Sequence, residues 1–151
     1  MHAANASPHR PLLILKVGQT HAAIRERLGD FDDWIAAGLQ RGGAQTATLD
    51  PRQGDALPDP ITLAGIVITG SHAMVSDREP WSEALLPWLR RAVECQTPLL
   101  GICYGHQLLA HALGGEVGFH PGGVEIGTVE VQRNAARDND PLIGSLPRVF
   151  E

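Results

Sequence analysis

The sequence predicts an α/β fold with a mostly parallel sheet, helices on both faces and a short β extension after the last helix. Apolar runs of strand length alternate along the chain with segments of helical periodicity. The apolar runs are nearly continuous, which is typical of strands covered on both faces. With 151 residues, of which 43% are hydrophobic, the chain suits one domain. We expect residues 1–11 to form a flexible tail and residues 12–151 to form that domain.

Four segments have the length and composition of strands. They cover residues 12–17, 44–49, 65–69 and 97–102, and a loop rich in proline and glycine, residues 50–60, separates the second from the third. Because strands alternate with helices, right-handed crossovers are expected to make the strands parallel. Ligands of such sheets bind beyond the carboxyl ends of the strands.

Helices are predicted where apolar residues recur at helical spacing. Residues 24–39 show this spacing, and Gly29-Asp30 is expected to divide them into a short first helix and a second one. Another helix is expected to begin near Pro80 and to continue to Glu94, with a kink or a restart at Pro87. The last predicted helix covers residues 104–113.

The pattern changes after this last helix. Residues 116–119 and 125–131 read as two extended pieces separated by a turn over residues 120–123. Pairing of these two pieces would give the short β extension. We see no internal repeat or low-complexity tract in the chain.

Charge and hydropathy exclude several classes of function. The net charge is −5 and no basic stripe is present, which argues against a nucleic-acid or anionic-membrane partner. No apolar run reaches the roughly 18 residues of a membrane-spanning helix. Cys95 and Cys103 fall at opposite ends of one predicted strand, roughly 16 Å apart, whereas a disulfide needs Cα atoms within about 7 Å. Two free thiols fit a reducing compartment, so we expect a cytoplasmic protein.

Cys103 is the candidate nucleophile. It lies between the fourth predicted strand and the last predicted helix, and it is flanked by Gly101 and Gly105. Backbone N–H groups at a helix N-terminus favour a thiolate over a thiol, and flanking glycines permit a sharp turn and a close approach of substrate. This is the pattern of a nucleophile elbow. The alternative is a buried structural cysteine.

A second loop is predicted to lie beside this cysteine. Gly70 and Ser71 directly follow the third predicted strand, and therefore belong to the same edge of the sheet. Acyl transfer needs two N–H donors aimed at the developing oxyanion, commonly one from the residue after the nucleophile and one from a neighbouring loop. Tyr104 and Gly70 or Ser71 are the candidates. The alternative is an ordinary turn after a strand.

The segment Gly101-Ile102-Cys103-Tyr104-Gly105-His106-Gln107 resembles the nucleophile motif of class I glutamine amidotransferases, with Cys-x-Gly-x-Gln intact. Residues 68–71 are similar to the oxyanion loop of that family, and residues 112–115 and 125–127 resemble later family segments in order and spacing. The resemblance is to stand-alone members similar to the amidotransferase domain of guanylate synthase. It implies a flavodoxin-like fold.

The resemblance also implies a reaction and its residues. Cys103 would attack the side-chain amide of glutamine, release ammonia and leave a glutamyl thioester that water cleaves to glutamate. Gly70, Ser71 and Tyr104 would bind the oxyanion. Gly101, Gly105 and Gln107 would contact the substrate. No metal and no cofactor is expected, and an ammonia-accepting synthetase is a candidate partner.

The sequence departs from this family in one respect. The family places its catalytic histidine and glutamate in a His-x-Glu motif on a later strand, and the 151 residues contain no such motif. His120 is followed by Gly122 where the glutamate belongs, so we reject it as the base. His72 and His106 have no evident carboxylate to orient them. We therefore interpret the chain as the amino-terminal portion of the domain, with impaired activity.

Two other functions remain open. One is a non-catalytic module that binds glutamine, or that is completed by a partner chain or by self-association through an uncovered sheet edge. The other is hydrolysis of a γ-glutamyl bond in a small molecule other than glutamine, through the same thioester.

Overall fold

The computed structural model describes residues 10–124, 126–134, 138–140 and 142–150. Most of the predicted tail, residues 1–11, lies outside the described residues. The chain divides into two compact units, residues 1–118 and 119–151. The prediction that residues 12–151 act as one domain stays a prediction.

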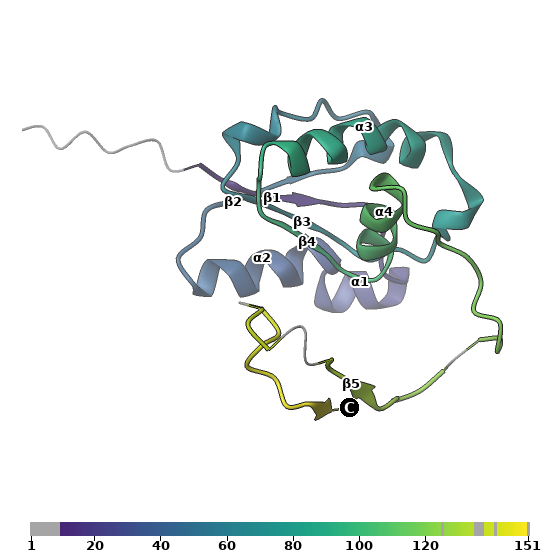
Figure 1. Ribbon diagram of the computed structural model, residues 1–151. Helices are drawn as coiled ribbons and strands as arrows, with labels where there is room; N and C mark the ends of the chain where they lie inside the picture. The colour runs from purple at the N-terminus through teal and green to yellow at the C-terminus, as the bar shows by residue number, and fades with distance from the viewer. Residues whose placement is uncertain (1–9, 125, 135–137, 141, 151) are drawn as a thin grey trace, which may run out of the picture. The chain divides into compact units, whose positions relative to one another are not determined.

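The first unit contains a four-stranded, fully parallel sheet with the strand order β2-β1-β3-β4 (Figure 1). The strands are β1 (Leu12–Leu15), β2 (Thr46–Leu49), β3 (Gly65–Ile68) and β4 (Leu99–Gly101). Each is shorter than its predicted run because the backbone pairing ends where the chain leaves for the loops. The predicted α/β fold with a parallel sheet is confirmed.

Helices cover both faces of this sheet (Figure 1). They are α1 (Ala22–Leu28), α2 (Phe31–Arg41), α3 (Pro80–Glu94) and α4 (Tyr104–Ala112). α1 and α2 lie on one face, α3 lies on the opposite face, and α4 packs beside α3 and the ends of β3 and β4. Among the described residues, no helix is both long and apolar enough to cross a bilayer.

The predicted division between the first two helices is confirmed. A kink or a restart is predicted at Pro87, and the structure shows no restart there. Asp30 is the N-cap of α2, and its side chain and that of Asp33 form a reciprocal capping box. α3 continues through Pro87 without a break. Its buried apolar side chains, Leu85, Leu86, Leu89 and Ala92, lie on both sides of the proline. Packing against the core therefore offsets the lost backbone hydrogen bond.

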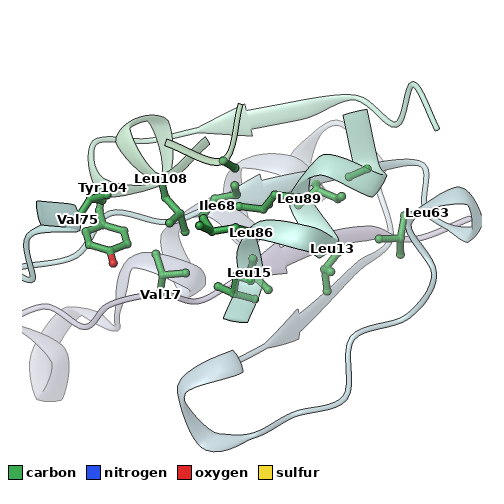
Figure 2. Packing of buried hydrophobic residues seen from close by; sticks show 14 residues of the cluster. Leu13, Leu15, Val17, Leu63, Ile68, Val75, Leu86, Leu89, Tyr104 and Leu108 are labelled. Atoms are coloured by element: carbon green, nitrogen blue, oxygen red, sulfur yellow. The ribbon is translucent and has the colours of Figure 1, made fainter. Parts of the chain in front are cut away.

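The core lies between the sheet and the layer of α3 and α4. Figure 2 shows its side chains gathered there, with Tyr104 and Leu108 of α4 close to Val75 and Ile68. By contrast, α1 has no buried residue, and Leu28 on it is 67% exposed. The face of the sheet that α1 and α2 cover is thus less completely packed than the face under α3.

The second unit contains two short strands, β5 (Val131–Gln132) and β6 (Val149–Phe150), which pair antiparallel. A short β extension after α4 is thus present as predicted, but the segments predicted to form it are wrong apart from Val131. Residues 116–119 and 126–130 form no strand, and residue 125 lies outside the described residues. The apolar side chains of Val124 and Ile126 do not pack against the protein, since they are 88% and 93% exposed. Alternation of apolar and polar residues stabilises a strand only where one face is covered, so it was not sufficient here.

Candidate active site

Cys103 occupies a sharp turn between β4 and α4. It is the N-cap of α4, with φ 51° and ψ −107°, a backbone conformation that is strained for a residue with a Cβ. The Ile102 N–H donates to the Ile68 carbonyl at 3.0 Å, and the Gly105 N–H donates to the Ile102 carbonyl at 2.9 Å. The turn is therefore held on both sides, and the Cys103 residue at its tip is exposed.

The two glycines that flank this turn are required by packing. A Cβ on Gly101 would lie 2.5 Å from the backbone nitrogen of His106, and a Cβ on Gly105 would lie 2.6 Å from the backbone carbonyl oxygen of Ile68. Both glycines thus let the first turn of α4 approach the strand ends closely. Their predicted contact with substrate stays a prediction.

Tyr104 anchors the turn to α3. Its side chain is 1% exposed, its hydroxyl donates to the Ser82 Oγ at 2.9 Å, and its ring stacks on Trp81 with centroids 5.8 Å apart. Burial raises the pKa of Tyr104, so the hydroxyl stays a donor. As the first residue of α4, Tyr104 has a backbone N–H without an acceptor inside the helix. That N–H therefore belongs to a residue whose side chain is firmly held.

The loop after β3 lies beside Cys103, as predicted. A Cβ built on Gly70 would be 3.7 Å from the Cys103 Cβ. Thr69 Oγ1 accepts from the Val17 N–H at 3.0 Å and donates to the Gly70 carbonyl at 3.0 Å, which ties this loop to the loop after β1. Ser71 Oγ accepts from the Ala73 N–H at 3.1 Å. Gly70 and the candidate nucleophile are thus neighbours.

Sequence reasoning missed a third loop, which supports the one at Gly70. A Cβ on Gly18 would lie 2.4 Å from the Gly70 carbonyl oxygen and 2.5 Å from the Ser71 Cα. The available signal was its position: Gly18 follows the first predicted strand and therefore reaches the same sheet edge.

A buried charge network holds this third loop, and sequence reasoning missed it too. Lys16 Nζ lies 3.0 Å from the Asp30 carboxylate and 2.6 Å from the Asp32 carboxylate. Asp30 also accepts from the Thr20 N–H at 2.7 Å. Burial tends to raise the pKa of Asp30, but the hydrogen bonds from Thr20 and Lys16 outweigh it and lower that pKa overall. Burial likewise opposes the charge of Lys16, yet bonds to the two carboxylates raise its pKa overall.

Cys103 opens onto a pocket of about 500 Å³, which we call the Cys103 pocket. Its lining residues come from α2, from the loop after β3 and from the turn before α4: Phe31, Trp34, Ile35, Gly70, Ser71, His72, Ile102 and Cys103. Gln107 is not among them. It is partly buried one turn further along α4, where its backbone N–H donates to the Cys103 carbonyl at 3.1 Å.

The histidines differ in their relation to Cys103. His72 lines the Cys103 pocket, and its ring packs on His21 with centroids 4.6 Å apart. His106 is exposed, whereas His111 Nε2 lies 3.0 Å from a Glu83 carboxylate oxygen. His120 belongs to the second unit. Within the part of the chain that the structure describes, no three His, Cys, Asp or Glu side chains are grouped to hold a metal ion.

The sequence is similar to those of known proteins. Residues 30–149 match the profile of the family Glutamine amidotransferase class-I. A glutamine-hydrolyzing GMP synthase subunit of Natronomonas pharaonis is 35% identical over 127 residues, which are 84% of this chain and 61% of that protein. The chain therefore belongs to the class-I glutamine amidotransferase family.

Two solved structures share the fold. The structure of a glutamine amidotransferase from Methylobacillus flagellatus aligns with a TM-score of 0.57 at 29% sequence identity. The aligned region covers 74% of this chain and 42% of that chain. A glutamine amidotransferase from Thermotoga maritima gives a TM-score of 0.70 at 22% identity and covers 94% of this chain and 58% of that chain. The flavodoxin-like fold is thus confirmed. This chain spans less than two thirds of each of these proteins.

Proposed function

We propose that Cys103 is the nucleophile of a glutamine-hydrolysing reaction. Its sulfur forms a bond to the side-chain amide carbon of glutamine. The carbon–nitrogen bond then breaks, and the nitrogen takes up a proton as ammonia leaves. Water cleaves the thioester to glutamate and restores the thiol.

One observation carries this proposal: the strained turn at Cys103 lies directly beside Gly70. The N–H of Tyr104 and an N–H from the loop at Gly70 and Ser71 are the proposed oxyanion donors. Gly101, Gly105 and Gln107 are the proposed substrate contacts. Support comes from family membership, because residues 30–149 match a family of glutamine amidotransferases.

We assign no side chain of these 151 residues as the base that takes the proton of the thiol and delivers it to the departing nitrogen. They contain no His-x-Glu motif, and His72, the one described histidine in the Cys103 pocket, contacts other rings. Removing the base from a nucleophile and base pair lowers the rate by about three orders of magnitude or more. We therefore propose that the 151-residue chain is acylated by glutamine but turns over slowly.

Labelling with a chloroketone analogue of glutamine tests the proposal. Peptide mass spectrometry follows Cys103 and Cys95 in the same sample, so that the partly buried Cys95 serves as an internal reference. We expect Cys103 to react faster, and excess glutamine to protect it. Equal rates at the two cysteines, or no protection by glutamine, would refute the assignment.

A synthetase that accepts the ammonia is the proposed partner. Support comes from the name of the Natronomonas relative, which designates one subunit of GMP synthase. Ammonia release in a coupled assay, measured with and without a candidate synthetase chain, tests this part separately. A rate that the added chain leaves unchanged counts against the partnership.

A further inference from the structure

Three rings that line the Cys103 pocket, those of His72, Phe31 and Trp34, form a row that continues to His21 outside the lining. The centroid distances are 4.6 Å from His21 to His72, 6.1 Å from His72 to Phe31 and 5.7 Å from Phe31 to Trp34. The row combines the N-cap of α1, the loop after β3 and the first two turns of α2. Two separate segments, the loop after β3 and α2, therefore contribute rings to the pocket lining, and Cys103 lines the same pocket.

α2 contributes its apolar face to the pocket. Phe31, Trp34 and Ile35 are spaced i, i+3 and i+4, so they lie on one side of the helix. Trp34 is 43% exposed, and its indole N–H donates to the Leu28 carbonyl at 2.6 Å. The indole is thus oriented by a hydrogen bond while much of its apolar surface remains available to a ligand.

The lining offers no charged side chain to the charged end of an amino acid, and its polar side chains are Ser71 and His72. None of the pocket-lining residues is Asp, Glu, Lys or Arg. The α-amino and α-carboxylate groups of a glutamyl moiety need charged or hydrogen-bonding partners when they leave water. An uncharged ring, in contrast, gains free energy by covering the exposed surface of Trp34 and Ile102.

We propose that the Cys103 pocket binds the ring of an N-aryl or N-arylalkyl γ-glutamyl amide, and that such amides are substrates of this site. The inference rests on the proposed acyl transfer at Cys103. The sulfur again bonds to the γ-carbonyl carbon and forms the glutamyl thioester, while the breaking carbon–nitrogen bond releases an aryl or arylalkyl amine that takes up the proton lost by the thiol. A pocket of about 500 Å³ lies within the usual range of small-molecule sites.

Two alkylating reagents test the pocket independently of any enzymatic turnover. Iodoacetamide and iodoacetanilide both transfer a carbonylmethyl group to a thiolate with loss of iodide, and they differ by one phenyl ring. For each thiol we take the ratio of its alkylation rate with iodoacetanilide to its rate with iodoacetamide. We expect this ratio to be roughly tenfold larger for Cys103 than for glutathione, because partial burial of the phenyl ring in the pocket stabilises the anilide complex. A ratio equal to that of glutathione overturns the proposal.

Variants then locate the effect. Trp34→Ala and, as a second variant, Ile35→Ala remove apolar lining, and each is expected to lower the ratio toward that of glutathione. Ile61→Ala is the matched control, because Ile61 is 50% exposed and lies outside the pocket lining. Circular dichroism identifies any variant that is not folded. If both folded pocket variants keep the wild-type ratio, the proposal is wrong.

A substrate comparison separates this inference from the proposed function. We expect a single-turnover release of aniline from γ-glutamyl anilide that is faster than ammonia release from glutamine, with the advantage reduced in Trp34→Ala. If the chloroketone labels Cys103 no faster than Cys95, the glutaminase proposal is contradicted. If the chloroketone labels Cys103 as expected but the anilide-to-amide ratio at Cys103 equals that of glutathione, only the ring pocket is contradicted. A wild-type dimer that Trp34→Ala makes monomeric would identify the pocket as an interface between copies and overturn the inference.

Discussion

At the scale of single residues, Tyr104 combines two tasks in one position. Its backbone N–H is a proposed oxyanion donor, and its buried side chain is bound to Ser82 on α3. The position of the Tyr104 N–H therefore depends on the hydrogen bond that the Tyr104 side chain makes to Ser82. We therefore expect Ser82 to act on the site through Tyr104, as a positioning residue.

Replacing Tyr104 by phenylalanine tests this dependence. The change leaves the buried Ser82 hydroxyl without its donor and is expected to lower the free energy of unfolding by about 1 kcal/mol. Chloroketone labelling of Cys103 should slow, while labelling by iodoacetamide stays the same, because only the first reaction uses the oxyanion donors. An equal decrease for both reagents would indicate a general loss of structure instead.

Gly105 and Gly38 form a matched pair for a stability measurement. Gly105→Ala places a Cβ 2.6 Å from the Ile68 carbonyl oxygen and should destabilise the protein by about 2 kcal/mol. Gly38→Ala meets nothing within 4 Å on the exposed side of α2 and should stabilise by roughly 0.5–1 kcal/mol. Urea unfolding of both variants gives the two values. Similar values of the same sign would contradict the packing role of Gly105.

Some of these residue roles could be predicted from the sequence and others could not. Cys103 is identifiable because a strand, a glycine turn and a helix meet there within a few residues. The packing role of Gly101 and Gly105 depends on Ile68 and on the close approach of α4 to the strand ends. A single sequence does not show whether a glycine faces a ligand or a neighbouring backbone.

At the scale of elements, Asp30 joins the loop after β1 to α2. Asp30→Ala removes the N-cap of α2 and one partner of the buried Lys16. We expect a loss of about 3 kcal/mol in the free energy of unfolding. Asp33→Ala removes only the other half of the capping box, so about 1 kcal/mol is expected. Thermal or urea unfolding of both variants checks the difference, and equal losses would show that the ion pair contributes little.

The same carboxylate predicts a pH dependence. Because the pKa of Asp30 is lowered on folding from the ordinary value of 3.8, its stabilising effect is complete above that value. It disappears as the pH falls through the lower, folded pKa. The stability difference between wild type and Asp30→Ala, measured by urea unfolding, should therefore be constant from pH 7 to 5 and shrink below pH 4. A difference that grows on acidification would contradict this assignment.

Elements that repeat a simple pattern were predictable, and the short ones were not. The four parallel strands are apolar runs, and their parallel direction follows from crossover rules. β5 and β6 contain two residues each and are separated by residues 133–148, so no local turn or periodicity indicates their pairing. The sequence likewise indicates a break between two helices at Gly29-Asp30, but it does not indicate that Asp30 and Asp33 form a capping box there.

At the scale of the whole molecule, the hydrophobic core belongs to one unit. All the buried core residues identified in the structure lie between Leu13 and Ala112, within residues 1–118. A chain ending at Gly118 should therefore unfold cooperatively, with a Tm within about 5 °C of the full chain. Differential scanning calorimetry measures this. Loss of a cooperative transition would show that residues 119–151 are needed for folding.

The overall arrangement of the site was predictable, but its walls were not. Parallel strands place the loops after β1, β3 and β4 at one edge, so the meeting of Gly70 and Cys103 follows from topology. The contribution of Phe31 and Trp34 depends on how α2 sits against the sheet. Their helical spacing indicates a packed face, and the sequence alone does not distinguish a core contact from a ligand contact.

The strained backbone at Cys103 has a consequence for the evolution of this chain in the laboratory. A residue with φ 51° and ψ −107° destabilises the native state by roughly 1–3 kcal/mol, and glycine would relieve that strain. Selection for heat resistance alone would therefore enrich glycine at position 103 and discard the thiol. A library screened for thermostability must be screened for thiol reactivity in parallel, because at this position the two properties favour different residues.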